Sequence, residues 1–153
     1  MSFRSYAPGD FEAMFALDEV CFTPEFRFSR SSMRRFAEAR RARVVIAEAE
    51  GVLAGFVIVH LEKMGGTNVS YVVTLDVAPD WRRLGLAARL MHEAELASTG
   101  CAAMLLHVFT GNEDAIRFYE RLGFERSHTE EAFYGEGLDA FVYRKRLDPA
   151  QAS

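Results

Sequence analysis

The sequence predicts one domain of mixed α and β structure. The stretch 84–98 places apolar residues at the spacing of an amphipathic helix, and several strand-like apolar runs lie around it. The run 103–109 is apolar except for His107, which suits a central strand covered on both faces. At 153 residues the chain can bury one self-sufficient core, and no repeat or linker divides it. We therefore expect a single α/β domain over residues 1–148, followed by a disordered tail at 149–153.

The first half of the chain predicts a strand, two helices and three further strands. Asp10 follows a Pro-Gly turn and is placed to cap the first helix, while Ser31 and Ser32 can cap the second. A Glu-Gly-Val turn then joins two strand-like runs into an antiparallel hairpin, and a Gly-Gly turn leads to the next strand. In chain order, the expected elements are strand 3–6, helix 10–21, helix 32–41, and strands 43–49, 53–63 and 69–77.

The second half predicts two helices that alternate with strands. Gly100 follows the first of these helices, and Gly123 is the natural end of the second. Asn112 is the expected N-cap of that second helix, and such a cap stabilises a helix by roughly 1 kcal/mol. In chain order, the expected elements are helix 84–98, strand 103–109, helix 113–122, a strand that begins at 125–127, a loop at 134–137 and a final strand 140–147.

Composition and charge exclude several classes of protein. The net charge of −4 offers no basic surface for nucleic acid. No apolar run approaches the ~18 residues of a membrane span, and the N-terminus has no signal-peptide pattern, so we expect a cytoplasmic protein without a membrane partner. Cys21 and Cys101 are isolated and are expected to be buried thiols, not a disulfide. The four histidines show no paired ligand spacing, so no metal site is expected.

The stretch from Val77 to Ala87 predicts a binding site for a pyrophosphate. A strand-like run enters a Pro-Asp turn, and an Arg-Arg-Leu-Gly-Leu-Ala segment leads into a helix. The first N–H groups of a helix lack intrahelical partners, and the helix dipole adds partial positive charge there. Gly85 has no Cβ, which lets a phosphate approach the backbone closely. Arg82 and Arg83 add charged donors suited to phosphate oxygens.

Two segments of the chain carry a pair of motifs that belong together. The first is Arg-x-x-Gly-x-Ala at 82–87, and the second is Asn-x-x-Ala-x-x-x-Tyr-x-x-x-Gly-Phe at 112–124. They resemble the GNAT superfamily of N-acetyltransferases, most of all its ribosomal-protein-alanine and N-terminal protein acetyltransferases. The resemblance covers roughly residues 43–147 and implies acetyl-CoA as the acetyl donor. The residues that it places at the acetyl-CoA site are Val77, Arg82, Arg83, Leu84, Gly85, Leu86, Ala87 and Asn112.

The resemblance also implies a fold. In the GNAT fold a mixed, mostly antiparallel sheet carries helices on both faces, and the strand before the pyrophosphate turn splays away from the next strand. The splay exposes backbone groups to the pantetheine arm of the cofactor. The backbone N–H at Val77 is thereby implied to bind the thioester carbonyl, and Asn112 is implied to contact the cofactor in addition to capping its helix.

His107 and Tyr119 are the candidates for proton transfer. Acetyl transfer from a thioester to an amine needs a neutral amine, a stabilised carbonyl oxygen and a protonated thiolate. Tyr119 occupies the tyrosine position of the second motif, and a phenol is protonated at neutral pH, so it can donate to the thiolate. An imidazole titrates near neutral pH, so His107 can take the amine proton directly or through water. The structural alternatives are a core tyrosine and a core histidine. Three acids could also face an amine but are expected to be solvated charges: Glu62, Asp76 and Glu136.

The substrate is indicated only by a loop before the last strand. Phe133-Tyr134, followed by Asp139-Ala140, resembles the Tyr-Tyr-x-x-x-x-Asp-Ala segment of N-terminal protein acetyltransferases, whose aromatic loop packs on the substrate peptide. We therefore expect direct attack by a protein or peptide N-terminal α-amine. The alternatives are a small-molecule amine, such as an amino acid, polyamine or antibiotic, and a non-catalytic acyl-CoA-binding module. A monomer and a homodimer both fit the sequence.

Overall fold

The computed structural model describes residues 1–147, and the helices and strands follow the expected order. Short 3-10 turns at Pro8–Asp10 and Pro79–Trp81 precede α1 and the loop that leads to α3. The tail expected at 149–153 lies outside the described residues. The elements are β1 (Ser2–Ser5), α1 (Phe11–Cys21), α2 (Arg30–Glu38), β2 (Ala42–Ala49), β3 (Val52–Met64), β4 (Thr67–Val77), α3 (Leu86–Ala97), β5 (Ala103–Phe109), α4 (Glu113–Arg121), β6 (Glu125–Glu130) and β7 (Ala140–Arg146).

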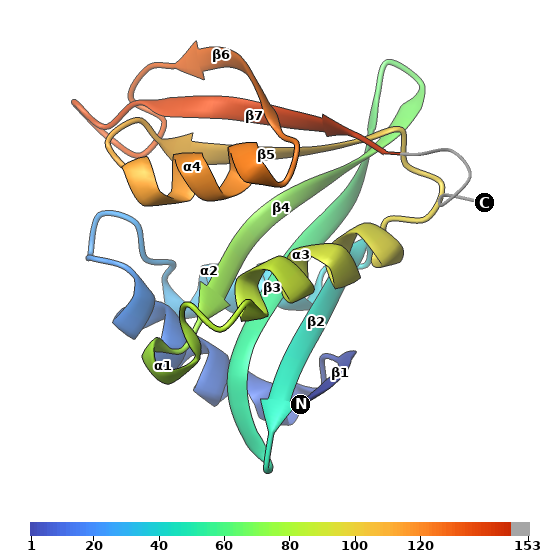
Figure 1. Ribbon diagram of the computed structural model, residues 1–153, viewed down its shortest axis with the longest axis vertical. Coiled ribbons are helices and arrows are strands. Elements are labelled where there is room, and N and C mark those ends of the chain that lie inside the picture. The colour runs from blue at the N-terminus through green and yellow to red at the C-terminus, as the bar shows by residue number, and fades with distance from the viewer. Residues whose placement is uncertain (148–153) are drawn as a thin grey trace.

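The strands form one mixed sheet in the order β1-β2-β3-β4-β5-β7-β6. Every neighbouring pair is antiparallel except β4 and β5, which run parallel. These two strands pair only from Val69↔Ala103 to Tyr71↔Leu105. Beyond Tyr71 they diverge, and the sheet opens into a V between them (Figure 1). The expected mostly antiparallel sheet with one splayed strand is therefore confirmed.

A β-bulge in β4 accounts for the divergence. The register between β3 and β4 skips one residue, Val73, between two consecutive pairs. Such an extra residue bends the bulged strand and increases its local twist. Val73 lies just beyond Tyr71, the last β4 residue that pairs with β5. The bend therefore directs the second half of β4, which ends at Val77, away from β5.

Helices cover both faces of the sheet, as expected (Figure 1). α3 and α4 pack on one face, where Leu90 and Tyr119 belong to the larger core cluster. α1 and α2 pack on the other face, where Met14 and Met33 belong to a second cluster. Because successive strand residues point to opposite faces, the strands at the V contribute side chains to both layers.

Two helix caps differ from the expectation. The Asp10 side chain makes no capping bond to α1 and instead accepts two hydrogen bonds from the Arg4 guanidinium, at 2.8 and 2.9 Å. A bidentate, charge-assisted pair of this kind is stronger than a neutral cap. Ser29 caps α2 by accepting a hydrogen bond from the backbone N–H of Ser32 at 3.1 Å. The expected caps, Ser31 and Ser32, lie inside the first turn of that helix.

Candidate active site

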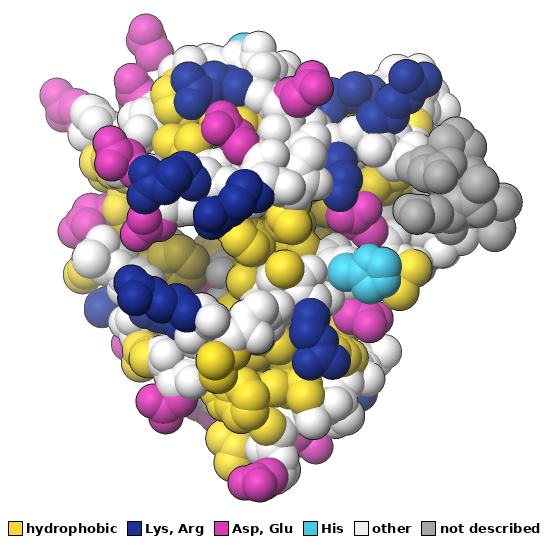
Figure 2. Space-filling view, in the orientation of Figure 1, with side chains coloured by type: hydrophobic (Ala, Val, Ile, Leu, Met, Phe, Trp, Pro, Cys, Tyr) yellow, Lys and Arg dark blue, Asp and Glu magenta, His cyan; other side chains and the backbone are white. Residues whose placement is uncertain are grey.

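A cavity of about 1320 Å³ occupies the opening between β4 and β5. Its walls come from both strands, the α1–α2 loop, the loop before α3, α4 and the β6–β7 loop. Figure 2 shows the surface hollowed between the part that carries α4 and the part that carries α1 and α3, with hydrophobic side chains in the hollow and Lys or Arg side chains beside it. The site therefore combines apolar walls with positive charge.

The loop before α3 presents the start of that helix to the cavity. α3 begins at Leu86, and its N-cap, Gly85, has a left-handed backbone with φ +80° and makes no side-chain capping bond. The first N–H groups of α3 therefore lack both an intrahelical acceptor and a capping side chain. A Cβ built on Gly85 would meet no atom within 4 Å, so the space beside the helix start is open. This geometry suits a phosphate group.

Most of the residues expected at the acetyl-CoA site line this cavity. Two of them do not, because the Leu84 side chain is 66% exposed and the Leu86 side chain is 2% exposed in the core under α3. Because its side chain is buried, Leu86 can serve a ligand only through its backbone. The expected residues that do line the cavity are Val77, Arg82, Arg83, Gly85, Ala87 and Asn112.

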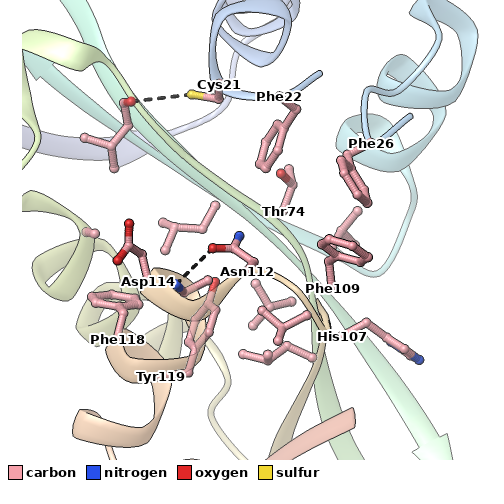
Figure 3. Close-up of a pocket in the computed structure, with 18 of the residues that line it drawn as sticks. Cys21, Phe22, Phe26, Thr74, His107, Phe109, Asn112, Asp114, Phe118 and Tyr119 are labelled. Atoms are coloured by element: carbon pink, nitrogen blue, oxygen red, sulfur yellow. Dashed lines mark hydrogen bonds between the residues drawn. The ribbon is translucent and has the colours of Figure 1, made fainter. Parts of the chain in front are cut away.

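Arg82 reaches back to the end of β4. Its Nε donates a hydrogen bond to the carbonyl of Val77 at 3.2 Å, and a terminal nitrogen lies 3.5 Å from the sulfur of Cys21. The Cys21 thiol donates to the same carbonyl at 3.4 Å (Figure 3). Arg82 therefore joins the end of α1 to the splayed strand. Cys21 is only partly buried and lines the cavity, contrary to the expectation, whereas Cys101 is buried as expected.

Asp76 and Asp18 form a buried acidic pair beside this junction. Both residues are 0% exposed, and one oxygen of each carboxyl group has no hydrogen-bond partner among the described residues. Asp76 also accepts a hydrogen bond from the Thr74 hydroxyl at 2.5 Å, and Asp18 accepts one from the N–H of Phe28 at 3.1 Å. Burial raises the pKa of both carboxyl groups, and the Asp18 carboxyl raises that of Asp76 further. The expectation of a solvated charge at Asp76 is therefore wrong.

His107 faces the cavity from the middle of β5. Leu106 and Val108 point into the core under α3 and α4, so strand alternation turns His107 toward the opposite face. Its Nδ1 lies 2.7 Å from the hydroxyl of Tyr71, at the point where β4 leaves β5. Phe133 stacks on the imidazole, with ring centroids 3.8 Å apart and planes 4° apart. Tyr71 was not among the expected site residues, because it belongs to neither motif.

Tyr119 enters the cavity from α4, on the other face of the sheet from His107. The residue is 9% exposed and packs edge-on against Phe118 and Phe124. Burial raises the pKa of its hydroxyl well above the ordinary value for a tyrosine, so the phenol stays protonated. Asn112 lies beside it in the cavity wall and caps α4, as expected, by accepting a hydrogen bond from Ala115 N–H at 3.1 Å (Figure 3).

An aromatic wall closes the cavity at the β6–β7 loop. Tyr134 packs edge-on against Phe26 of the α1–α2 loop, with centroids 5.0 Å apart, and Phe26 lies 5.1 Å from Phe109. The Asp139 carboxylate holds the loop by accepting a hydrogen bond from the backbone N–H of Ala132 at 2.9 Å. Burial raises the pKa of Tyr134 to about 12. Phe26 and Phe109 were missed in the sequence, because no local pattern shows that the α1–α2 loop and the end of β5, so far apart in the chain, meet.

The described part of the chain offers neither a membrane-spanning helix nor a metal cluster. None of the helices within residues 1–147 has the length and apolar character needed to cross a membrane. Within the same residues, no group of three or more His, Cys, Asp or Glu side chains is arranged to hold a metal ion.

Several known proteins are similar in sequence to this chain. N-alpha-acetyltransferase 60 of Xenopus tropicalis is 36% identical over 87 residues, which are 52% of this chain and 36% of that protein. The catalytic subunit of the N-terminal acetyltransferase A complex of Arabidopsis thaliana is 31% identical over 111 residues, which are 70% of this chain and 58% of that protein. The chain thus spans less than two thirds of the length of these relatives.

Solved structures share the fold, and a family model matches most of the chain. The ribosomal-protein-S18-alanine N-acetyltransferase of Escherichia coli superimposes with a TM-score of 0.84 at 21% identity, over 96% of this chain and 94% of that one. NAA60 of Arabidopsis thaliana in complex with acetyl-CoA superimposes with a TM-score of 0.81 at 21% identity, over 95% and 98%. The model of the acetyltransferase (GNAT) family matches residues 11–124. The chain therefore belongs to the acetyltransferase (GNAT) family.

Proposed function

We propose that this protein is an N-acetyltransferase that moves an acetyl group from acetyl-CoA to a primary amine. The observation that carries the proposal is the cavity at the V of the sheet, which joins a helix start suited to phosphate with side chains suited to proton transfer. Two relatives are N-alpha- or N-terminal acetyltransferases by name, and one structural neighbour is a complex with acetyl-CoA. The two free thiols fit a reducing compartment, so we place the activity in the cytoplasm.

We propose that the loop before α3 and the end of β4 hold the acetyl donor. Its pyrophosphate would accept hydrogen bonds from the first N–H groups of α3, in the open space beside Gly85. Arg82 and Arg83 line the same part of the cavity and add positive charge. The backbone N–H of Val77 is proposed to polarise the thioester carbonyl, and Asn112 to contact the pantetheine arm.

The two faces of the sheet separate the two reactants. Tyr119 lies on the face covered by α3 and α4, where the donor binds, whereas His107 lies on the opposite face. The amine and the thioester therefore approach each other through the V from opposite sides. Holding them together in this way removes the entropic cost of a bimolecular encounter, so no covalent enzyme intermediate is needed.

The proton transfers follow from this arrangement. The amine nitrogen forms a bond to the thioester carbonyl carbon, and the carbon–sulfur bond breaks. His107 takes the amine proton, directly or through water, because only a neutral amine can attack. Tyr119 donates its proton to the departing thiolate, which its raised pKa allows because the phenol is always protonated beforehand. The attacking nitrogen loses its second proton as the amide forms. The enzyme returns to its starting state when Tyr119 takes up that proton and His107 releases the first one to solvent.

We propose that the amine is the N-terminal α-amine of a protein or peptide. The aromatic wall of Phe26, Phe109 and Tyr134 stands beside His107 and offers an apolar surface to the first side chain of a peptide. Glu25 and Glu62 also line the cavity, and two carboxylates of this kind could attract a cationic small amine instead. The aromatic wall is the larger and more enclosed feature, which favours the peptide.

The test is thiol release from acetyl-CoA by the purified protein with two panels of acceptors. One panel contains short peptides that differ in their first residue, and the other contains amino acids, polyamines and aminoglycosides. We expect turnover on peptides, with a preference that depends on the first side chain. Turnover restricted to small amines would overturn the substrate proposal, and acetyl-CoA binding without turnover on either panel would overturn the enzymatic one.

A further inference from the structure

Both nitrogens of the His107 imidazole face a polar group. Nδ1 lies 2.7 Å from the Tyr71 hydroxyl. Nε2 is buried and lies 3.2 Å from Oε2 of Glu130, the last residue of β6. The two atoms are at ion-pair distance, although their alignment falls short of a formed hydrogen bond. Glu130 is 42% exposed at its side chain, so a small rotation would complete the bond.

The chemistry of these neighbours selects one tautomer of the imidazole. An ionised carboxylate only accepts hydrogen bonds, so Glu130 favours a proton on Nε2. Nδ1 then has a free lone pair and accepts from the Tyr71 hydroxyl. Burial raises the pKa of Tyr71 well above its ordinary value, which keeps the phenol neutral and able to donate. The three groups are thus consistent with a single arrangement of protons.

Glu130 also connects the buried ring to the surface. Its second oxygen, Oε1, lies 3.6 Å from Nε2 of His128, a residue of the same strand whose side chain is 57% exposed. The side chain of His107 is only 14% exposed, and Phe133 stacks on its ring. A proton that reaches His107 therefore has a polar route toward solvent along the edge strand β6.

We propose that Glu130 is a positioning residue for His107. It holds the imidazole with the proton on Nε2 and the lone pair on Nδ1, so that Nδ1 takes up the amine proton. The Nε2 proton then passes to Glu130, which together with His128 forms the path to solvent. The proposal rests on the proposed function, in which His107 accepts that proton. Neither motif contains Glu130, which lies beyond the Gly-Phe that ends the second one.

The test uses two variants of Glu130 and one matched control. Glu130→Ala removes the acceptor, whereas Glu130→Gln keeps an acceptor oxygen and removes only the charge. Glu136→Gln removes the same charge from the neighbouring β6–β7 loop, at an exposed position. The first measurement is the nitrogen chemical shifts of the His107 ring by NMR, which report the tautomer without any substrate. The second is kcat and KM for acetyl-CoA with a substrate peptide.

We expect wild type, Glu130→Gln and Glu136→Gln to show the tautomer with the proton on Nε2, and Glu130→Ala to show a mixture. In Glu130→Ala, kcat should fall roughly ten- to hundred-fold, the scale on which partners that orient a functional histidine act, while KM for acetyl-CoA stays within about two-fold. Glu130→Gln should lose less, and small exogenous bases should restore part of the activity of Glu130→Ala.

Two results would overturn the proposal. One is a wild-type spectrum with the proton on Nδ1, or a tautomer in Glu130→Ala that is unchanged. The other is a loss of kcat in Glu136→Gln as large as that in Glu130→Ala, which would indicate a general charge effect. Failure of the proposed function has a different signature, because full activity in His107→Ala would remove the base while leaving the tautomer measurement unaffected.

Discussion

Gly85 provides the sharpest test of the phosphate site. It adopts φ +80° as the N-cap of α3, and a Cβ at this position would point into open space. Gly85→Ala therefore costs stability through backbone strain alone, by about 1–2 kcal/mol. A stability loss of that size lowers the Tm of a domain of this length by roughly 2–8 °C. Gly85→Val adds a branched side chain in the space that the phosphate is proposed to occupy.

Gly100 supplies a matched control at the other end of the same helix. Its φ is +87°, and a Cβ there would also meet no atom within 4 Å. Gly100→Ala should therefore cost about the same stability as Gly85→Ala, for the same reason. Gly100 is not among the residues that line the cavity. A difference in acetyl-CoA affinity between the two variants thus reports the local role of Gly85, separately from any general destabilisation.

The expected loss of affinity follows from the hydrogen bonds at stake. A hydrogen bond from a backbone N–H to a charged phosphate contributes about 1.5–3 kcal/mol, so losing one weakens binding roughly ten- to hundred-fold. Calorimetric titration with acetyl-CoA should show this loss in Gly85→Val, a smaller one in Gly85→Ala and none in Gly100→Ala. Equal affinities in all three variants would refute the assignment of the phosphate to the start of α3.

Three further changes test the remaining parts of the site. Tyr119→Phe should lower turnover roughly hundred-fold with acetyl-CoA affinity unchanged by calorimetry, and an equal loss of both would rule out the role of Tyr119 as the acid. His107→Ala should lose most activity near neutral pH and recover as pH rises above about 8, where an α-amine deprotonates unaided; a flat pH profile would make His107 structural. Asp76→Asn should raise the Tm near neutral pH by a few degrees, on the order of 1–2 kcal/mol. Because the pKa of the Asp76 carboxyl is raised in the folded state, its ionisation destabilises the fold at a pH above that raised value. Below the ordinary carboxyl pKa the group is protonated in both the folded and the unfolded state, so the gain in Tm should vanish near about pH 4. A gain in Tm that persists at that pH would contradict the buried-charge explanation.

Local periodicity predicted most of the helices and strands. β5 has the expected bounds, Ala103–Phe109, because the limits of an apolar run between polar turns can be recognised from the local sequence alone. α4 ends one residue before the expected limit, next to its glycine stop. β6 extends to Glu130, although its residues are polar and mostly exposed, because pairing with β7 along its backbone holds it in place. The pattern of burial that reveals a strand is absent from such an edge.

The parts of the site that depend on contacts between distant segments could not be predicted. The bulge at Val73 leaves no mark in the sequence, yet it opens the sheet. The Tyr71–His107 contact joins β4 to β5, and the Asp76–Asp18 contact joins β4 to α1. Each of these pairs is created by the order of the strands and by helix packing, which a linear pattern does not specify. The motif residues were predictable because their chemistry is local to one turn or one helix.

In the proposed reaction, the cavity brings the α-amine of a peptide to the thioester of acetyl-CoA. The most direct measurement uses a peptide that carries both a free α-amine and an internal lysine, and locates the added acetyl group by fragmentation mass spectrometry. We expect one acetyl group on the α-nitrogen, none on the lysine, and no thiol release when the α-amine is blocked beforehand. Acetylation of the lysine side chain, or unchanged thiol release with the blocked peptide, would contradict it.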